Sequence, residues 1–62
     1  MDNIINELIN YNNKNHLSWI KVFKEVINKL NIPYTDKLLH NTVTELSRLG
    51  YIIIDEPFKL EK

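Results

Sequence analysis

The stretch Thr35–Lys62, TDKLLHNTVTELSRLGYIIIDEPFKLEK, decides the fold. Its first part repeats leucine at helical spacing and ends at Gly50, where a left-handed residue commonly closes a helix. Four β-forming residues, Tyr51–Ile54, follow the glycine and predict a strand. After the turn Asp55–Pro57, the alternating segment Phe58–Leu60 is expected to return as the partner strand, with its two apolar residues facing inward. The stretch therefore predicts a helix followed by a β-hairpin.

The helix within this stretch is expected to span about Asp36–Leu49, with Thr35 as its N-cap. Asp36 in the first turn suits the positive end of the helix dipole. On a helical wheel, the inward arc holds Leu38, Leu39, Val43, Leu46 and Leu49, with Thr42 inside it. The outward arc holds Lys37, His40, Asn41, Thr44, Ser47 and Arg48, with Glu45 at its margin.

Two further helices are expected upstream. The first covers about Asp2–Tyr11 and carries an apolar stripe at helical spacing, formed by Ile4, Ile5, Leu8, Ile9 and Tyr11. The Asn-rich residues 12–15 then end it in a turn. The second is expected from Trp19 to about Leu30, with Ser18 as its N-cap. It is the most clearly amphipathic segment, and the break at residues 31–34 separates it from the third helix.

The composition narrows the range of functions. The 62 residues form one small domain, residues 1–62, whose stability must come from apolar packing because no cysteine is present. His16 and His40 stand far apart and lack matching ligands nearby, so we expect no metal site and no cofactor. There is no phosphate-binding loop and no paired-carboxylate motif, so we do not expect an enzyme.

Charge and hydropathy bear on partners and location. Eight basic residues balance eight acidic ones, which counts against strong nonspecific binding to DNA but leaves room for a basic face. No apolar run approaches the length of a membrane span, and no signal peptide is recognised, so a cytoplasmic protein is expected. The abundance of Asn, Ile and Lys, which share AT-rich codons, favours an AT-rich genome such as that of a phage, a low-GC bacterium or a large virus.

The element order resembles the winged helix-turn-helix superfamily. The residues that carry the resemblance are Leu30-Asn31-Ile32 in the turn and Val43-Thr44-Glu45-Leu46-Ser47-Arg48-Leu49-Gly50-Tyr51-Ile52. The second segment is similar to a V-x-x-L-x-x-x-G-Y-I pattern of bacterial winged-helix regulators, in which the valine and leucine face the core. The resemblance implies a mainly α fold with three helices and a small C-terminal β-hairpin. It also implies that residues 16–18 pair with the hairpin as a minimal strand and that Ile32 enters the core.

The resemblance further implies a small DNA-binding transcriptional regulator with helix 36–49 as its recognition helix in double-stranded DNA. The side-chain types of the outward arc suit this role. Lys37 and Arg48 can neutralise phosphates, Arg48 can read guanine, and Asn41 can read adenine, while the other three can hydrogen-bond to bases or phosphates. Lys21 and Lys24, on the second helix, are expected to contact the DNA backbone. The hairpin turn carries Asp55 and Glu56, so we expect it to contribute little.

Two expectations concern partners. A single recognition helix covers few base pairs, so a homodimer is expected, with the apolar stripe of residues 4–11 as its surface. The alternative function is a protein–protein interaction module with a winged-helix fold, such as a small phage protein that binds a host or regulatory protein. The zero net charge and the acidic hairpin turn favour this alternative.

Overall fold

Three helices precede a two-stranded hairpin in the computed structural model, which describes residues 2–12 and 16–62. The elements are α1 (Asp2–Tyr11), α2 (Trp19–Lys29), α3 (Asp36–Arg48), β1 (Ile52–Ile54) and β2 (Lys59–Glu61). The expected fold class, mainly helical with a small C-terminal hairpin, is therefore confirmed, and each helix ends within one residue of its expected bounds. Residues 13–15 of the expected Asn-rich turn lie outside the described residues.

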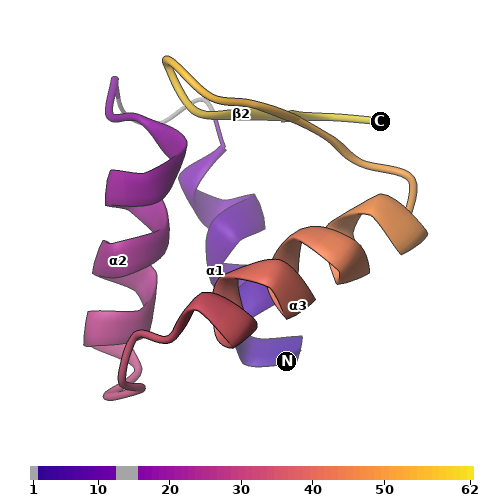
Figure 1. Cartoon of the computed structure of the whole chain (residues 1–62). Helices are drawn as coiled ribbons and strands as arrows, with labels where there is room; N and C mark the ends of the chain where they lie inside the picture. The colour runs from indigo at the N-terminus through magenta and orange to yellow at the C-terminus, as the bar shows by residue number, and fades with distance from the viewer. Residues whose placement is uncertain (1, 13–15) are drawn as a thin grey trace.

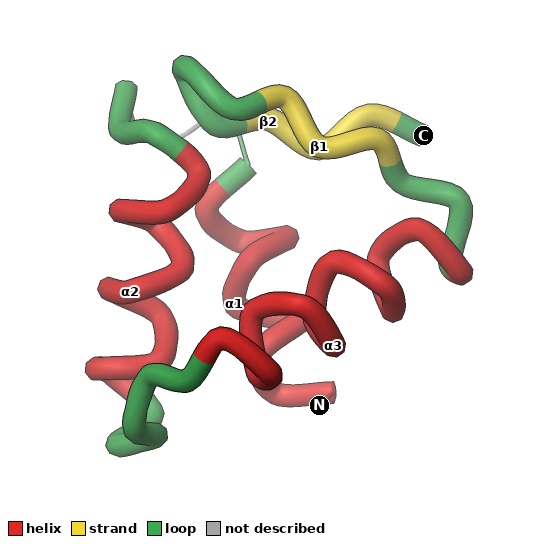
Figure 2. The backbone as a smooth tube through the Cα atoms, viewed as in Figure 1, coloured by secondary structure: helices red, strands yellow, loops and turns green. Residues whose placement is uncertain are grey.

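The helices form the body of the molecule and the hairpin covers one end of it. Figure 1 shows α1 and α2 side by side, with α3 starting beside the lower end of α2 and running across the lower part of α1, and with the hairpin across the upper ends of both. This arrangement places α3 and the hairpin on opposite ends of the α1–α2 pair. The short chain after α3 rises along the side of the molecule to reach β1, as Figure 2 shows.

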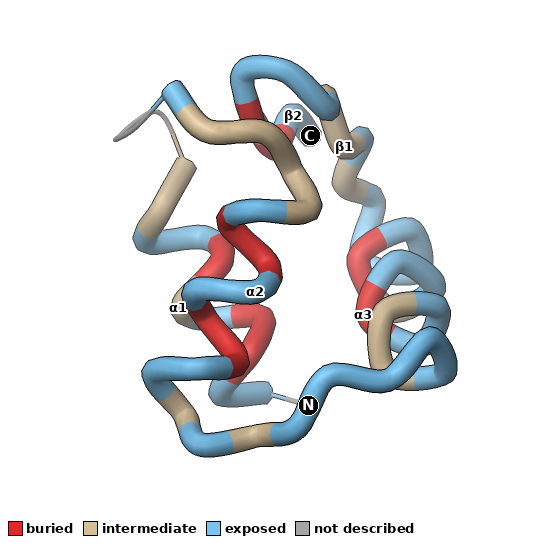
Figure 3. The backbone as a smooth tube through the Cα atoms, turned by 60° about the vertical axis from the view of Figure 1, so that its left-hand side comes forward, coloured by how far each residue is buried: buried red, intermediate tan, exposed pale blue. Residues whose placement is uncertain are grey.

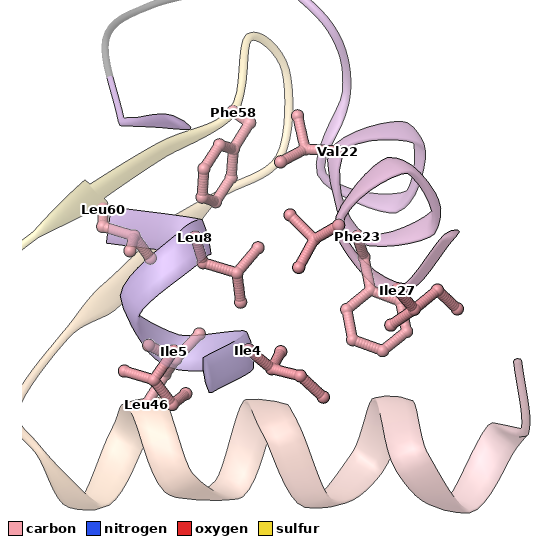
Figure 4. Close-up of a cluster of buried hydrophobic side chains, with 10 residues drawn as sticks. Ile4, Ile5, Leu8, Val22, Phe23, Ile27, Leu46, Phe58 and Leu60 are labelled. Carbon is pink, nitrogen blue, oxygen red and sulfur yellow. The ribbon is translucent and has the colours of Figure 1, made fainter. Parts of the chain in front are cut away.

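One apolar core joins all three helices to the hairpin. Its buried members are Ile4, Ile5, Leu8, Val22, Phe23, Val26, Ile27, Leu46, Phe58 and Leu60. In Figure 4, Leu8 lies between the hairpin side chains Phe58 and Leu60 and the lower group that includes Ile5 and Leu46. Phe58 and Leu60 therefore face inward as expected, and Ile32 packs against the core from the turn between α2 and α3.

Both α2 and α3 are followed, two residues after their last residue, by a residue with a left-handed backbone. Asn31 has φ 58° after α2, and Gly50 has φ 91° after α3. In each case the next residue donates its N–H to a carbonyl five residues earlier, from Ile32 to Ile27 at 2.8 Å and from Tyr51 to Leu46 at 2.9 Å. These bonds form the Schellman arrangement, which satisfies the last carbonyls of a helix and turns the chain sharply. The turn at Asn31 therefore directs the chain into α3, and the turn at Gly50 directs it from α3 into the hairpin.

The hairpin is tied to the helices by hydrogen bonds at two places. β1 and β2 pair antiparallel, with Ile53 opposite Leu60. The side-chain amide of Asn12 donates to the Leu60 carbonyl at 3.0 Å and accepts from the Leu60 N–H at 2.9 Å, so it occupies the outer edge of β2. The connector before α2 reaches the turn of the hairpin, because Phe58 N–H donates to the Leu17 carbonyl at 2.8 Å and Trp19 N–H donates to the Asp55 carbonyl at 2.7 Å.

These connector bonds bear on the expected minimal strand at residues 16–18. Of these residues only Leu17 bonds to the hairpin through its backbone, with Trp19 of α2 adding a second bond, and the described residues form a sheet of two strands only. Trp19 strengthens the same junction, since its ring lies 5.5 Å from both Phe23 and Phe58. Ser18 does precede α2 as its N-cap, although its side chain makes no capping hydrogen bond.

The buried stripe of α3 is narrower than expected. Val43 and Leu49, expected in the core, each expose 37% of their surface, whereas Thr42 and Leu46 are fully buried. The reason is that α3 crosses the other helices and does not lie along them, so its buried positions face α1 and α2 on one flank only (Figure 3). The Thr42 hydroxyl tolerates burial because it donates to the Leu38 carbonyl at 2.8 Å.

The apolar stripe of α1 is used within the chain. Ile4, Ile5 and Leu8 are buried, Tyr11 packs against the core, and Ile9 alone of the five is exposed, at 38%. The expectation of a dimer surface over residues 4–11 rested on a surplus of apolar residues. The structure reduces that surplus to Ile9, because α1 packs against α2, α3 and the hairpin at once.

Candidate nucleic-acid interface

The outward arc of α3 is the candidate interface. Every side chain expected to face outward does so: Lys37, His40, Asn41, Thr44, Ser47 and Arg48 are all exposed. The start of this helix is fixed because the Thr35 side chain accepts the Leu38 N–H at 3.0 Å, as expected for its N-cap. The arc is thus presented on a helix with defined ends.

Arg48 differs from the rest of the arc because it is already paired. Its guanidinium donates two hydrogen bonds to Glu45 Oε2 and one to Oε1, at 2.7 to 3.1 Å. These hydrogen bonds hold the pKa of Glu45 below its usual range and raise the pKa of Arg48. The spacing of three residues is one at which helical side chains meet, so the sequence carried a signal for this pair. In the described structure, Glu45 neutralises the C-terminal end of the arc.

Lys24 of α2 lies over the ring of Tyr34, which comes just before α3. Its Nζ lies 5.4 Å from the centre of the Tyr34 ring, a distance at which a cation is attracted to the ring face. Tyr34 also packs edge-on against Phe23 and donates its hydroxyl to Asp36 at 3.2 Å. Loss of hydration and this hydrogen bond to Asp36 raise the pKa of Tyr34. Tyr34 therefore belongs to the candidate site, although its place in the break at residues 31–34 carries no local signal for such a role.

The remaining charges are distributed around this arc. Lys21 is exposed on α2, but no described contact links it to α3. Lys29, also on α2, pairs with Glu7 of α1 at 2.8 Å, which raises the pKa of Lys29. The acidic turn residues Asp55 and Glu56 are exposed at the tip of the hairpin, on the end of the molecule opposite α3. Lys37 on α3 and Lys24 over Tyr34 are therefore the two lysines that lie at the start of the outward arc.

A hollow of about 370 Å³ lies beside the arc, between α1, the end of α3 and the last residue of the chain. Ile9 and Leu49 give it an apolar wall, and both are exposed. The paired Glu45 and Arg48 lie on its polar side, and Lys62 places its Nζ 5.0 Å from the Tyr51 ring. This hollow was not anticipated, because it depends on how α3 crosses α1.

Residues 2–12 and 16–62 hold neither a cluster of metal-ligating side chains nor a helix suited to spanning a membrane. In those residues no group of three or more His, Cys, Asp or Glu side chains lies close enough to hold a metal ion. None of the helices in that part of the chain combines the length and the apolar character of a membrane span. Comparison of the chain with family models, curated proteins and solved structures gave no match.

Proposed function

We propose that this protein is a small DNA-binding domain of the winged helix-turn-helix type, with α3 as its recognition helix. The proposal is supported by the element order and by the outward arc, which presents Lys37, His40, Asn41, Thr44 and Ser47 to solvent without an acidic residue among them. Side chains of these types bind both base edges and phosphates. A role as a transcriptional regulator in the cytoplasm accords with this activity.

The proposal gives different roles to different positions along the arc. A recognition helix contacts base edges mainly through its N-terminal residues. On α3 these are Lys37, His40, Asn41 and Thr44, which make no described ion pair. Lys24, held over Tyr34 at the start of α3, supplies a phosphate contact from α2. Arg48 contributes only when it leaves Glu45.

The test is binding to mixed-sequence double-stranded DNA over a series of salt concentrations. Lys37→Ala is expected to weaken binding and to lower the slope of log affinity against log salt by about one, the value for one lost phosphate contact. Lys29→Ala removes the same charge from a residue paired with Glu7 away from the arc, so we expect it to leave the slope unchanged. Absence of binding at low salt, or equal effects of the two substitutions, contradicts the proposal.

Glu45→Gln gives a complementary test, because a weaker variant alone can have many causes. The substitution removes the charge that holds the Arg48 guanidinium. If α3 lies against DNA, the released guanidinium gains a phosphate, so affinity rises and the salt slope steepens by about one. A Glu45→Gln variant with unchanged affinity and slope would place Arg48 outside the interface.

A second function, binding of a protein partner, is favoured by the hollow beside the arc. Its exposed apolar residues Ile9 and Leu49 lie beside charged groups of both signs, as in many protein interfaces with an apolar centre and a polar rim. The acidic tip of the hairpin also suits a protein more than a phosphate backbone. Failure to bind DNA at low salt, with the fold intact, favours this function over the first.

A further inference from the structure

The hairpin has one open edge, which belongs to β1. Asn12 occupies the outer edge of β2, and Leu17 and Trp19 bond to the turn that joins the strands. Within residues 2–12 and 16–62, no backbone hydrogen bond is recorded from another segment to β1. Figure 3 shows β1 on the side of the hairpin away from α1 and α2.

The direction of the open groups follows from the pairing. In an antiparallel ladder, pairs of opposite residues alternate between two arrangements. In one pair the two residues hydrogen-bond to each other through both backbone groups, and in the next the N–H and C=O groups of both residues point away from the partner strand. The N–H and C=O of Leu60 point away from β1, because both bond to Asn12. Ile53 lies opposite Leu60, so its own N–H and C=O point away from β2 to the open edge.

The side chains along this edge are apolar and lack the usual protection. β1 consists of three isoleucines, and Ile52 exposes 65% of its surface, more than any other exposed large hydrophobic residue of the described chain. Natural edge strands are commonly protected by lysine, by proline or by a covering segment. Among residues 2–12 and 16–62, nothing but its short length protects β1.

We propose that the open edge of β1 pairs antiparallel with the β1 edge of a second copy of this chain. A twofold axis beside Ile53 lets the two Ile53 residues exchange both of their open hydrogen bonds, so the edge is complementary to itself. Ile52 of each copy then lies opposite Ile54 of the other on the outer face. This buries the most exposed apolar side chains of the hairpin.

The charges at the two ends of β1 select the antiparallel arrangement and the second copy. Asp55 and Glu56 follow the strand, whereas Lys62 lies over Tyr51 just before it. Antiparallel pairing brings Asp55 and Glu56 of each copy towards Lys62 of the other, while parallel pairing would bring the Asp55 and Glu56 side chains of the two copies together. The chain has zero formal net charge, so no long-range repulsion opposes self-association. A three-residue edge is small, so the association is reversible and depends on concentration.

Amide hydrogen exchange of the unmodified protein tests this directly. The Ile53 N–H is expected to exchange quickly in dilute solution and more slowly as protein concentration rises. The amides of Ile52 and Ile54 are internal controls, because the ladder already pairs them with β2 in a single chain. Sedimentation over the same concentrations should show a matching shift from monomer to dimer. A monomer throughout, with unchanged exchange at Ile53, overturns the proposal.

Substitutions identify the surface. Ile52→Lys, at an exposed position, should raise the dimer dissociation constant by roughly tenfold or more, because each change acts twice across the twofold axis. Ile9→Lys places the same charge on an exposed isoleucine of α1 and should leave association unchanged. Asp55→Lys should weaken the dimer, and adding Lys62→Glu should restore it. If Ile9→Lys disrupts the dimer and Ile52→Lys does not, the interface lies on α1 and the proposal is wrong. This result is independent of whether the protein binds DNA.

Discussion

Asn12 shows how one side chain closes the edge of a sheet. Its amide group presents an N–H donor and a C=O acceptor side by side, as a peptide group does, and it bonds to both open backbone groups of Leu60. The sequence predicts Asn12 only as a helix-ending residue, because its partner lies 48 positions later. Such a contact depends on the tertiary fold, and no local pattern reports it.

We predict that Asn12→Ala lowers the free energy of unfolding by about 1–3 kcal/mol, since it leaves a part-buried N–H and C=O without partners. The measurement is the midpoint of urea unfolding, followed by circular dichroism. Asn10→Ala makes the same substitution at an exposed position of α1 and should leave the midpoint nearly unchanged. Equal midpoints for the two variants would show that the bonds to Leu60 contribute nothing.

The ion pair between Glu45 and Arg48 should make the stability of the fold depend on pH. Arg48 lowers the pKa of Glu45 below its ordinary 4.5, so the pair stabilises the fold above pH 4.5 and loses this contribution as pH falls through the lower value. The stability difference between the parent and Glu45→Gln should thus be largest near neutral pH and vanish in acid. The effect is small because the pair is exposed. Glu25→Gln, at an exposed residue without a described ion pair, is the control, and the same pH-dependent loss there would contradict the assignment.

At the scale of elements, local signals predict the helices and their ends correctly. Leucine spacing places α3, Thr35 caps it and Gly50 ends it, all from neighbouring residues. The same signals fail for Val43 and Leu49, because their burial depends on the angle at which α3 crosses α1 and α2. For the candidate site, the outward direction of Asn41 was predictable from helical periodicity.

The left-handed backbone of Gly50 leads to a prediction about stability. Its φ of 91° is one that side chains with a Cβ rarely adopt, although an added Cβ would meet only a Lys62 side-chain carbon at 3.9 Å. Gly50→Ala should therefore destabilise the fold by about 1–2 kcal/mol through backbone strain alone. The comparison is Asn31→Gly at the end of α2, where φ is 58° and glycine fits without strain. Thermal unfolding of both variants checks this, and an unchanged midpoint for Gly50→Ala would contradict it.

For the whole molecule, size is the controlling quantity. A chain of 62 residues is expected to be stable by only about 3–9 kcal/mol, given about 0.05–0.15 kcal/mol per residue. All elements share one core, so damage at its centre affects every element together. The candidate interface on α3 therefore depends on the whole core for its position, because the packing that holds α3 also includes the hairpin.

Leu8→Ala should reveal this dependence. Leu8 is fully buried at the middle of the core, and its truncation typically costs about 2–5 kcal/mol, a large part of the total. We expect cooperative loss of α3 and the hairpin together, seen as one transition in nuclear magnetic resonance and circular dichroism. Ile9→Ala, at the neighbouring exposed position, should change the transition little. Separate melting of the hairpin would show that the core is divided.

The ties between the hairpin and the early part of the chain have a consequence for synthesis. Residues 2–48, which contain all three helices, leave the ribosome before Phe58 and Leu60. Until those two side chains emerge, Leu8 lacks its cover and Asn12 lacks its partner, so the nascent helices remain unsealed. Completion of the core thus waits for Leu60, and a stall shortly before that residue would expose an apolar surface to chaperones.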